Sequence, residues 1–205
     1  MELEQILPIL LICGGIAAVI ALVIVLVVLI RHTSLKKAGK LASQKAGGAL
    51  KNYAATHFCK TVNDVTLPHK GVPMQIDHLL VGYFGVLLVS SIEPDGDIYG
   101  ALRDDTWLIS NEKNGRRSRI KNLYVRTENS VLALRDAFKE AKVYNVPVES
   151  LIVVTRKKSS CCVPELKNVM SLPELKKYLR KSKFETDNNV DVDAVLAAIE
   201  KAKLN

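Results

Sequence analysis

The stretch that decides the fold is residues 73–100, PMQIDHLLVGYFGVLLVSSIEPDGDIYG. It predicts two short apolar strands, Gln75–Val81 and Val86–Ser91, joined by a tight Gly-Tyr-Phe-Gly turn and followed by an acidic loop. The second strand is so apolar that both of its faces must be covered, which makes it the central strand of a sheet. One carboxylate, Asp77, interrupts the first strand. Two interpretations remain open: Asp77 faces water at an edge, or it is paired or binds a metal.

The residues on either side predict further elements by their apolar periodicity. One helix is expected over Lys45–Phe58, and a longer one over Leu123–Ala141. The other expected elements are the strands Thr61–Leu67, Ile98–Leu102, Thr106–Ile109 and Leu151–Thr155, the basic loops Asn111–Lys121 and Arg156–Ser160, and the C-terminal helices Leu172–Leu179 and Val190–Leu204. The order of helix, three strands, helix and strand predicts an α/β fold with a mixed sheet.

The N-terminus carries a long apolar run, from Ile6 to Ile30, without a charged residue. The run is longer than the ~20 residues that a helix needs to cross a bilayer, and it is too long for a signal-peptide core. We therefore predict an uncleaved transmembrane helix. Lys and Arg crowd its C-terminal flank, whereas the preceding residues are acidic. This asymmetry predicts a single-pass protein of the inner cell membrane, with the N-terminus outside and residues 31–205 in the cytoplasm.

The charge of the remaining chain limits the classes of partner. The first 30 residues hold two of the 21 acids and none of the 29 bases, so residues 31–205 carry a net charge of +10. Such a charge favours polyanions, either nucleic acid or an anionic lipid surface, and solvated surface charge is the alternative interpretation. The four Cys residues show no zinc-type spacing, and we expect free thiols in a reducing cytoplasm.

The motifs of the central stretch resemble the nuclease-related domain called NERD, a branch of the PD-(D/E)xK, restriction-endonuclease-like fold. The resemblance rests on Ile76-Asp77-His78, on Gly85 to Val89, and on Gly96 to Gly100, followed by Trp107, Gly115 and Asn122 at fitting spacing. It covers roughly residues 47–155. It implies an αβββαβ core and, in an active member, a magnesium-dependent nuclease site.

At the family's catalytic positions this chain departs from the pattern. The resemblance places the family's Glu-x-Lys at Ser90 and Ile92, its helical Glu at Ala49, and its Gln on the later helix at Arg126. Only Asp77 remains of the catalytic groups. We expect no metal site that is complete, although Asp77 is a candidate ligand. Without a metal, Asp77 would be solvated or would accept hydrogen bonds from Ser90 or a backbone amide.

Two hypotheses for the function follow. The first is a catalytically silent NERD-like module at the membrane that binds or scaffolds, with DNA or RNA held non-specifically as one ligand. The residues that would contact phosphate are Arg116, Arg117, Arg119, Lys121, Arg156, Lys157 and Lys158. The second is an active magnesium-dependent nuclease that uses Asp77 with a relocated carboxylate, for which Glu93, Asp95 and Asp97 are the nearby acids.

The expected domain organisation follows the same features. The segments are a short external N-terminus (1–5), the transmembrane helix (6–30), a basic juxtamembrane linker (31–45), the NERD-like domain (46–160) and a C-terminal helical extension (161–205). The oligomeric state is left open by the sequence.

Overall fold

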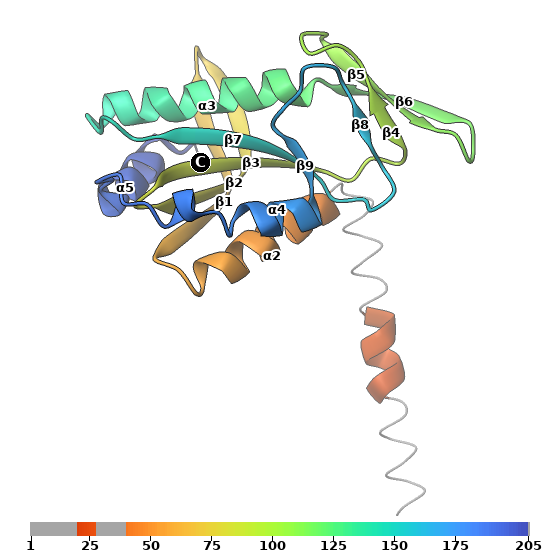
Figure 1. Cartoon of the computed structure of the whole chain (residues 1–205), viewed down its shortest axis with the longest axis horizontal. Helices are drawn as coiled ribbons and strands as arrows, with labels where there is room; N and C mark the ends of the chain where they lie inside the picture. The colour runs from red at the N-terminus through yellow and green to blue at the C-terminus, as the bar shows by residue number, and fades with distance from the viewer. Residues whose placement is uncertain (1–19, 28–39, 205) are drawn as a thin grey trace, which may run out of the picture. The chain divides into compact units, whose positions relative to one another are not determined.

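The computed structural model describes residues 20–27 and 40–204 (Figure 1). The chain divides into two compact units, residues 1–41 and 42–205. In the first unit residues 20–27 form a helix with exposed apolar side chains. Most of the predicted transmembrane run lies outside the described residues, and among those described no helix is both long and apolar enough to span a bilayer. The membrane helix therefore stays a prediction.

The second unit is built on a five-stranded mixed sheet with the strand order β1-β2-β3-β7-β9. Its strands are β1 (Cys59–His69), β2 (Val72–Gly82), β3 (Gly85–Ile92), β7 (Val148–Val154) and β9 (Val169–Ser171). The first three strands form an antiparallel meander, and β7 and β9 then add in parallel. Strand β3 is central and buried along Gly85–Ser90, as its apolar sequence predicts. Its first residue is a Gly because an added Cβ would lie 2.3 Å from the carbonyl oxygen of Pro147.

Helices cover both faces of this sheet, because β2 and β3 present apolar side chains alternately to each side. On one face lie α3 (Leu123–Glu140) and α5 (Val192–Ala202), packed on Leu79, Val81 and Leu88. On the other face lie α2 (Leu41–Ala54) and α4 (Leu172–Tyr178), packed on Leu80, Leu87 and Val89 (Figure 1). A short 3-10 turn, η1 (Ser182–Phe184), closes this second face.

A second sheet of four strands lies at the end of the domain where β3 ends, in the order β6-β5-β4-β8 (Figure 1). Its strands are β4 (Asp97–Tyr99), β5 (Thr106–Asn111), β6 (Arg116–Lys121) and β8 (Cys161–Cys162). Its inner face buries Ile98, Trp107 and Ile109 against Ile152 and Val154 of β7. We call it the small sheet.

The predicted order of elements is confirmed, with mixed sheets and with strands β4, β5 and β6 of the small sheet inserted between β3 and α3. Two expectations need correction. Asn111–Lys121 is not a loop, since its second half is strand β6, paired with β5 along its whole length. The predicted helical extension, residues 161–205, also contributes strands β8 and β9, one to each sheet.

Candidate functional site

Asp77 lies on β2 with its side chain toward α3, and it is 8% exposed. Its Oδ2 accepts a hydrogen bond of 2.8 Å from the backbone N–H of Ser91 on β3. Its Oδ1 accepts one of 2.7 Å from the guanidinium of Arg126, which reaches down from the first turn of α3. Both oxygens are therefore bound by the protein itself, and the carboxylate charge is compensated by an arginine.

The helix that carries Arg126 is fixed at its start by Asn122. The Asn122 side chain accepts from the backbone N–H groups of Tyr124 and Val125, which is the standard role of an N-cap. Its amide also donates to the carbonyl oxygens of Leu102 and Asp104, at 2.9 and 2.6 Å. The N-terminus of α3 is thus anchored to the loop of the small sheet. This anchoring sets the position from which Arg126 reaches Asp77.

Ser90 and Ile92, the residues expected at the family's Glu-x-Lys, carry no charged side chain. Ser90 is buried and its hydroxyl accepts a hydrogen bond of 2.9 Å from Thr127 of α3. Ile92 packs against the apolar cluster of the small sheet. The hydrogen bond to Asp77 expected from a backbone amide is present, and it comes from Ser91. The serine hydroxyl that donates to Asp77, at 3.4 Å, is also that of Ser91, whereas Ser90 bonds to Thr127.

The family's helical Glu position does not join this group. Ala49 of α2 is buried in the cluster on the opposite face of the sheet, beside Leu80 and Val89. The structure therefore brings together Asp77, Ser90 and Arg126 on the α3 face, and leaves Ala49 elsewhere.

The three acids named in the hypothesis of a relocated carboxylate have partners at other places. Glu93 turns to the α2 face, where its Oε1 accepts from Lys45 at 2.7 Å. Asp95 pairs with Arg156, and Asp97 accepts from the backbone N–H of Ser160 at 2.6 Å. Among residues 20–27 and 40–204, no three His, Cys, Asp or Glu side chains lie in a group able to hold a metal ion.

His78 follows Asp77 in the chain but points to the α2 face, as the alternation of side chains along a strand requires. It is buried against Gly47, with Nδ1 2.7 Å from Asn63 Oδ1 and Nε2 3.1 Å from Ser43 Oγ. The Asn oxygen can only accept, so Nδ1 carries the proton and Nε2 accepts from the serine hydroxyl. Burial lowers the pKa of His78. The neutral ring is therefore a structural link between α2 and the sheet, and it is not a partner of Asp77.

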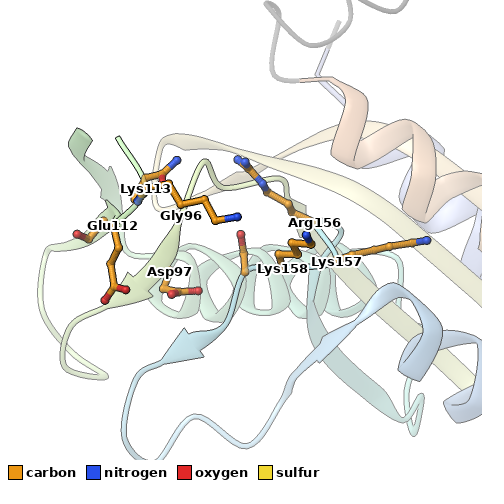
Figure 2. Close-up of a pocket in the computed structure, with 10 residues that line it drawn as sticks. Gly96, Asp97, Glu112, Lys113, Arg156, Lys157 and Lys158 are labelled. Carbon is orange, nitrogen blue, oxygen red and sulfur yellow. Dashed lines mark hydrogen bonds between the residues drawn. The ribbon is translucent and has the colours of Figure 1, made fainter. Parts of the chain in front are cut away.

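The basic residues lie in two places at the far end of the domain. Arg116, Arg117, Arg119 and Lys121 belong to β6, whose residues are almost all exposed. Arg156, Lys157 and Lys158 follow β7 and line a hollow of about 390 Å³ together with Lys113. Figure 2 shows Glu112 and Lys113 on one side of this hollow and the three basic residues of the loop on the other. We call it the basic hollow.

Contacts between the two loops fix the basic hollow. Arg156 pairs with Asp95 and donates to the carbonyl oxygen of Pro94 at 3.1 Å. The backbone N–H of Ile98 donates to the carbonyl oxygen of Ser160 at 2.9 Å. The hollow sits beyond the carboxyl ends of the parallel strands β3 and β7, where α/β sheets commonly bind ligands.

The sheet order, the acid on its second strand and the helix that covers that acid define a mixed α/β domain. The profile of the NERD family, described as nuclease-related domain, matches residues 38–155, more than half of the chain. The chain belongs to the NERD family. No curated protein and no solved structure matches it.

Proposed function

We propose that this chain is a catalytically silent NERD protein, held at the inner face of a membrane by its N-terminal helix, whose domain binds nucleic acid. The observation that carries the catalytic part is the ion pair between Asp77 and Arg126, 2.7 Å apart. A guanidinium now occupies one oxygen of the remaining acid, and a backbone N–H occupies the other. A divalent cation would have to displace an arginine charge and would find a single carboxylate in return.

The residues present do not fit magnesium. Mg²⁺ in nucleotide and nuclease sites is held by more than one oxygen ligand in near-octahedral geometry, usually with carboxylates. Here Ser90 bonds to Thr127, Ile92 is apolar, and the three relocated candidates, Glu93, Asp95 and Asp97, are held by other partners. The lysine that would assist an attacking water is also missing. The contacts therefore support a silent site over the alternative of an active magnesium-dependent nuclease.

The membrane part of the proposal rests on the sequence. The apolar run over residues 6–30 has the length of a spanning helix, and the basic flank lies on its C-terminal side. In that orientation the domain faces the cytoplasm, where nucleic acid and anionic headgroups are both available.

The nucleic-acid part rests on charge and its placement. The net charge of residues 31–205 is +10, and seven of its bases gather at one end of the domain, on β6 and in the loop after β7. Clustered Lys and Arg bind phosphates and release counterions, which gives affinity without sequence preference.

A nicking assay tests the silent site. The full chain in non-ionic detergent is incubated with supercoiled plasmid and either magnesium or manganese. We expect no conversion to open circles above that seen with an Asp77→Asn variant prepared in the same way. Metal-dependent nicking by the natural chain that Asp77→Asn abolishes would establish the active nuclease and refute the proposal.

A further inference from the structure

The outer face of the small sheet presents a line of three basic side chains. On β6, Ile120 pairs with Trp107 and turns inward, so Arg117, Arg119 and Lys121 turn outward. All three are exposed, and none of the ion pairs found among the described residues involves them. Alternate residues of a strand are about 6.7 Å apart. An extended single strand of nucleic acid spaces its phosphates comparably.

An aromatic side chain lies across the sheet from this line. Tyr99 of β4 is opposite Leu108 of β5, and Leu108 is opposite Arg119 of β6, so the three side chains form one row on the outer face. Tyr99 is 37% exposed, although the neighbouring Ile98 on the same strand is fully buried. An exposed ring on a sheet, with a cation two strands away in the same row, has the composition of surfaces that stack single-stranded bases.

A hollow of about 410 Å³ opens beside this ring, bordered by Tyr99, Leu108 and Arg119. Its volume lies within the ~300–1,000 Å³ typical of small-ligand pockets. Asp104 and Asp105 also line it. Two carboxylates there would repel a phosphate but can accept hydrogen bonds from base amino groups. The hollow therefore suits a base, and the line of cations suits the backbone that carries it.

The basic hollow continues the same face. Asp97 and Ser110, which line it, form the next row of the small sheet together with Arg117. Beyond them lie Lys113 and the basic loop after β7 (Figure 2). Basic residues thus occur on β6 up to Lys121 and around the hollow up to Lys158, with the acids Asp97 and Glu112 among the residues that line the hollow.

We infer that the outer face of the small sheet binds single-stranded nucleic acid, with a base stacked on Tyr99 and the phosphates following Arg117, Arg119 and Lys121 toward the basic hollow. This inference rests on the nucleic-acid binding proposed above and gives it a place and a strand preference. It separates the binding surface from the silent site around Asp77. A duplex has no unstacked base to offer Tyr99, so it would use the cations alone.

Fluorescence anisotropy with the full chain in non-ionic detergent tests this. The probes are a labelled single-stranded oligonucleotide of about 16 nucleotides, near the upper site size of known single-strand folds, and the same sequence as a duplex. We expect tighter binding of the single strand. Tyr99→Ala should weaken single-strand binding about 5-fold or more, because a stacked base contributes at least about 1 kcal/mol. Tyr99→Phe keeps the ring and should bind as the natural chain does.

Strand β6 offers a matched control for the cations. Arg119→Glu and Arg116→Glu make the same charge change on one strand, but Arg116 lies on the opposite face from Arg119. We expect Arg119→Glu to reduce affinity and flatten its salt dependence clearly more than Arg116→Glu. Thermal unfolding of each variant confirms that it is folded.

The outcomes separate the two proposals. Two results would overturn the single-strand surface and leave nucleic-acid binding itself standing. One is equal affinity for single strand and duplex that Tyr99→Ala does not change. The other is an equal loss of affinity in Arg119→Glu and Arg116→Glu. Absence of binding to either probe at low salt, with binding to anionic vesicles of phosphatidylglycerol, would overturn both and assign the basic surface to lipid.

Discussion

The pair formed by Asp77 and Arg126 makes a quantitative prediction about stability. In Arg126→Met the helix-forming tendency and the length of the side chain are kept, but the guanidinium is removed. Asp77, whose side chain is 12% exposed, then keeps its bond from the Ser91 amide and a longer one, of 3.4 Å, from the Ser91 hydroxyl. Hydrogen bonds to charged groups contribute ≈1.5–3 kcal/mol, and a fully buried ion that loses its partner costs about 3–5. Because Arg126 is itself 35% exposed, water reaches the site. We expect a loss of about 1.5–3 kcal/mol, the lower of these ranges.

A double-mutant cycle isolates the pair. Asp77→Asn keeps an oxygen for the Ser91 amide and removes the charge, and the double variant Asp77→Asn with Arg126→Met leaves no ion uncompensated. The double variant should therefore lose less stability than the two single variants together, by at least about 1 kcal/mol. Urea unfolding followed by the fluorescence of Trp107, the only Trp of the chain, measures each free energy.

A control and a refuting result complete the design. Arg135→Met makes the same change at an exposed position of α3, and we expect less than about 0.5 kcal/mol. If Arg126→Met cost no more than this control, or the coupling were below about 0.5 kcal/mol, Arg126 would not stabilise the carboxylate and the argument for a self-neutralised site would fail.

Three further predictions concern the rest of the chain. Gly48→Ala should stabilise α2 by roughly 1 kcal/mol, since the added Cβ meets nothing within 4 Å. Gly47→Ala should destabilise the domain, because its Cβ would lie 2.7 Å from the His78 ring. Urea unfolding of the two variants measures both changes. Burial lowers the pKa of His78, so the unfolded chain binds more protons at this residue, and the free energy of unfolding should fall as the pH drops below about 6.5. In unfolding experiments across pH, His78→Gln should reduce this loss. The same change at the exposed His57 should not. The full-length protein should stay in the membrane fraction after carbonate or high-salt washes, and its release without detergent would contradict the predicted spanning helix.

The sequence predicts the centre of the fold because the signals there are local and strong. The run Val86–Val89 has no polar residue, and a strand of this kind is buried on both faces wherever it occurs. Likewise, the alternation of β2 correctly turns Asp77 and His78 to opposite faces. Strand β6 was missed for a physical reason: as an edge strand it has one apolar inward residue, Ile120, and the other inward positions are polar. Strands β8 and β9, two and three residues long, are too short to show any period.

The partners of the site residues lie beyond what a single sequence predicts. Arg126 is 49 positions from Asp77, and Lys45 is 48 from Glu93, so no local rule joins them. One signal was available for the first pair. Arg126 follows the N-cap Asn122 by four residues, which places both on one side of the first turn of α3. If that side faces the sheet, Arg126 points toward the strand that carries Asp77. The distance between Arg126 and Asp77 also depends on how α3 is placed over the sheet. The hydrogen bonds of Asn122 to the loop of the small sheet fix the start of this helix.

The charges around Asp77 form a consistent set, and this consistency is the main reason to treat the site as silent. A metal site concentrates acids whose repulsion the cation relieves, so losing the cation leaves unpaired charge in a partly buried place. Here one acid remains, one arginine compensates it, and the two neighbouring positions are a hydroxyl bonded to Thr127 and an apolar side chain. Restoring a single catalytic group would break the balance: Ser90→Glu alone would place a second carboxylate on the buried α3 face, where Arg126 already serves the first. On the proposed silent site, metal binding would therefore require several simultaneous changes, including removal of the arginine.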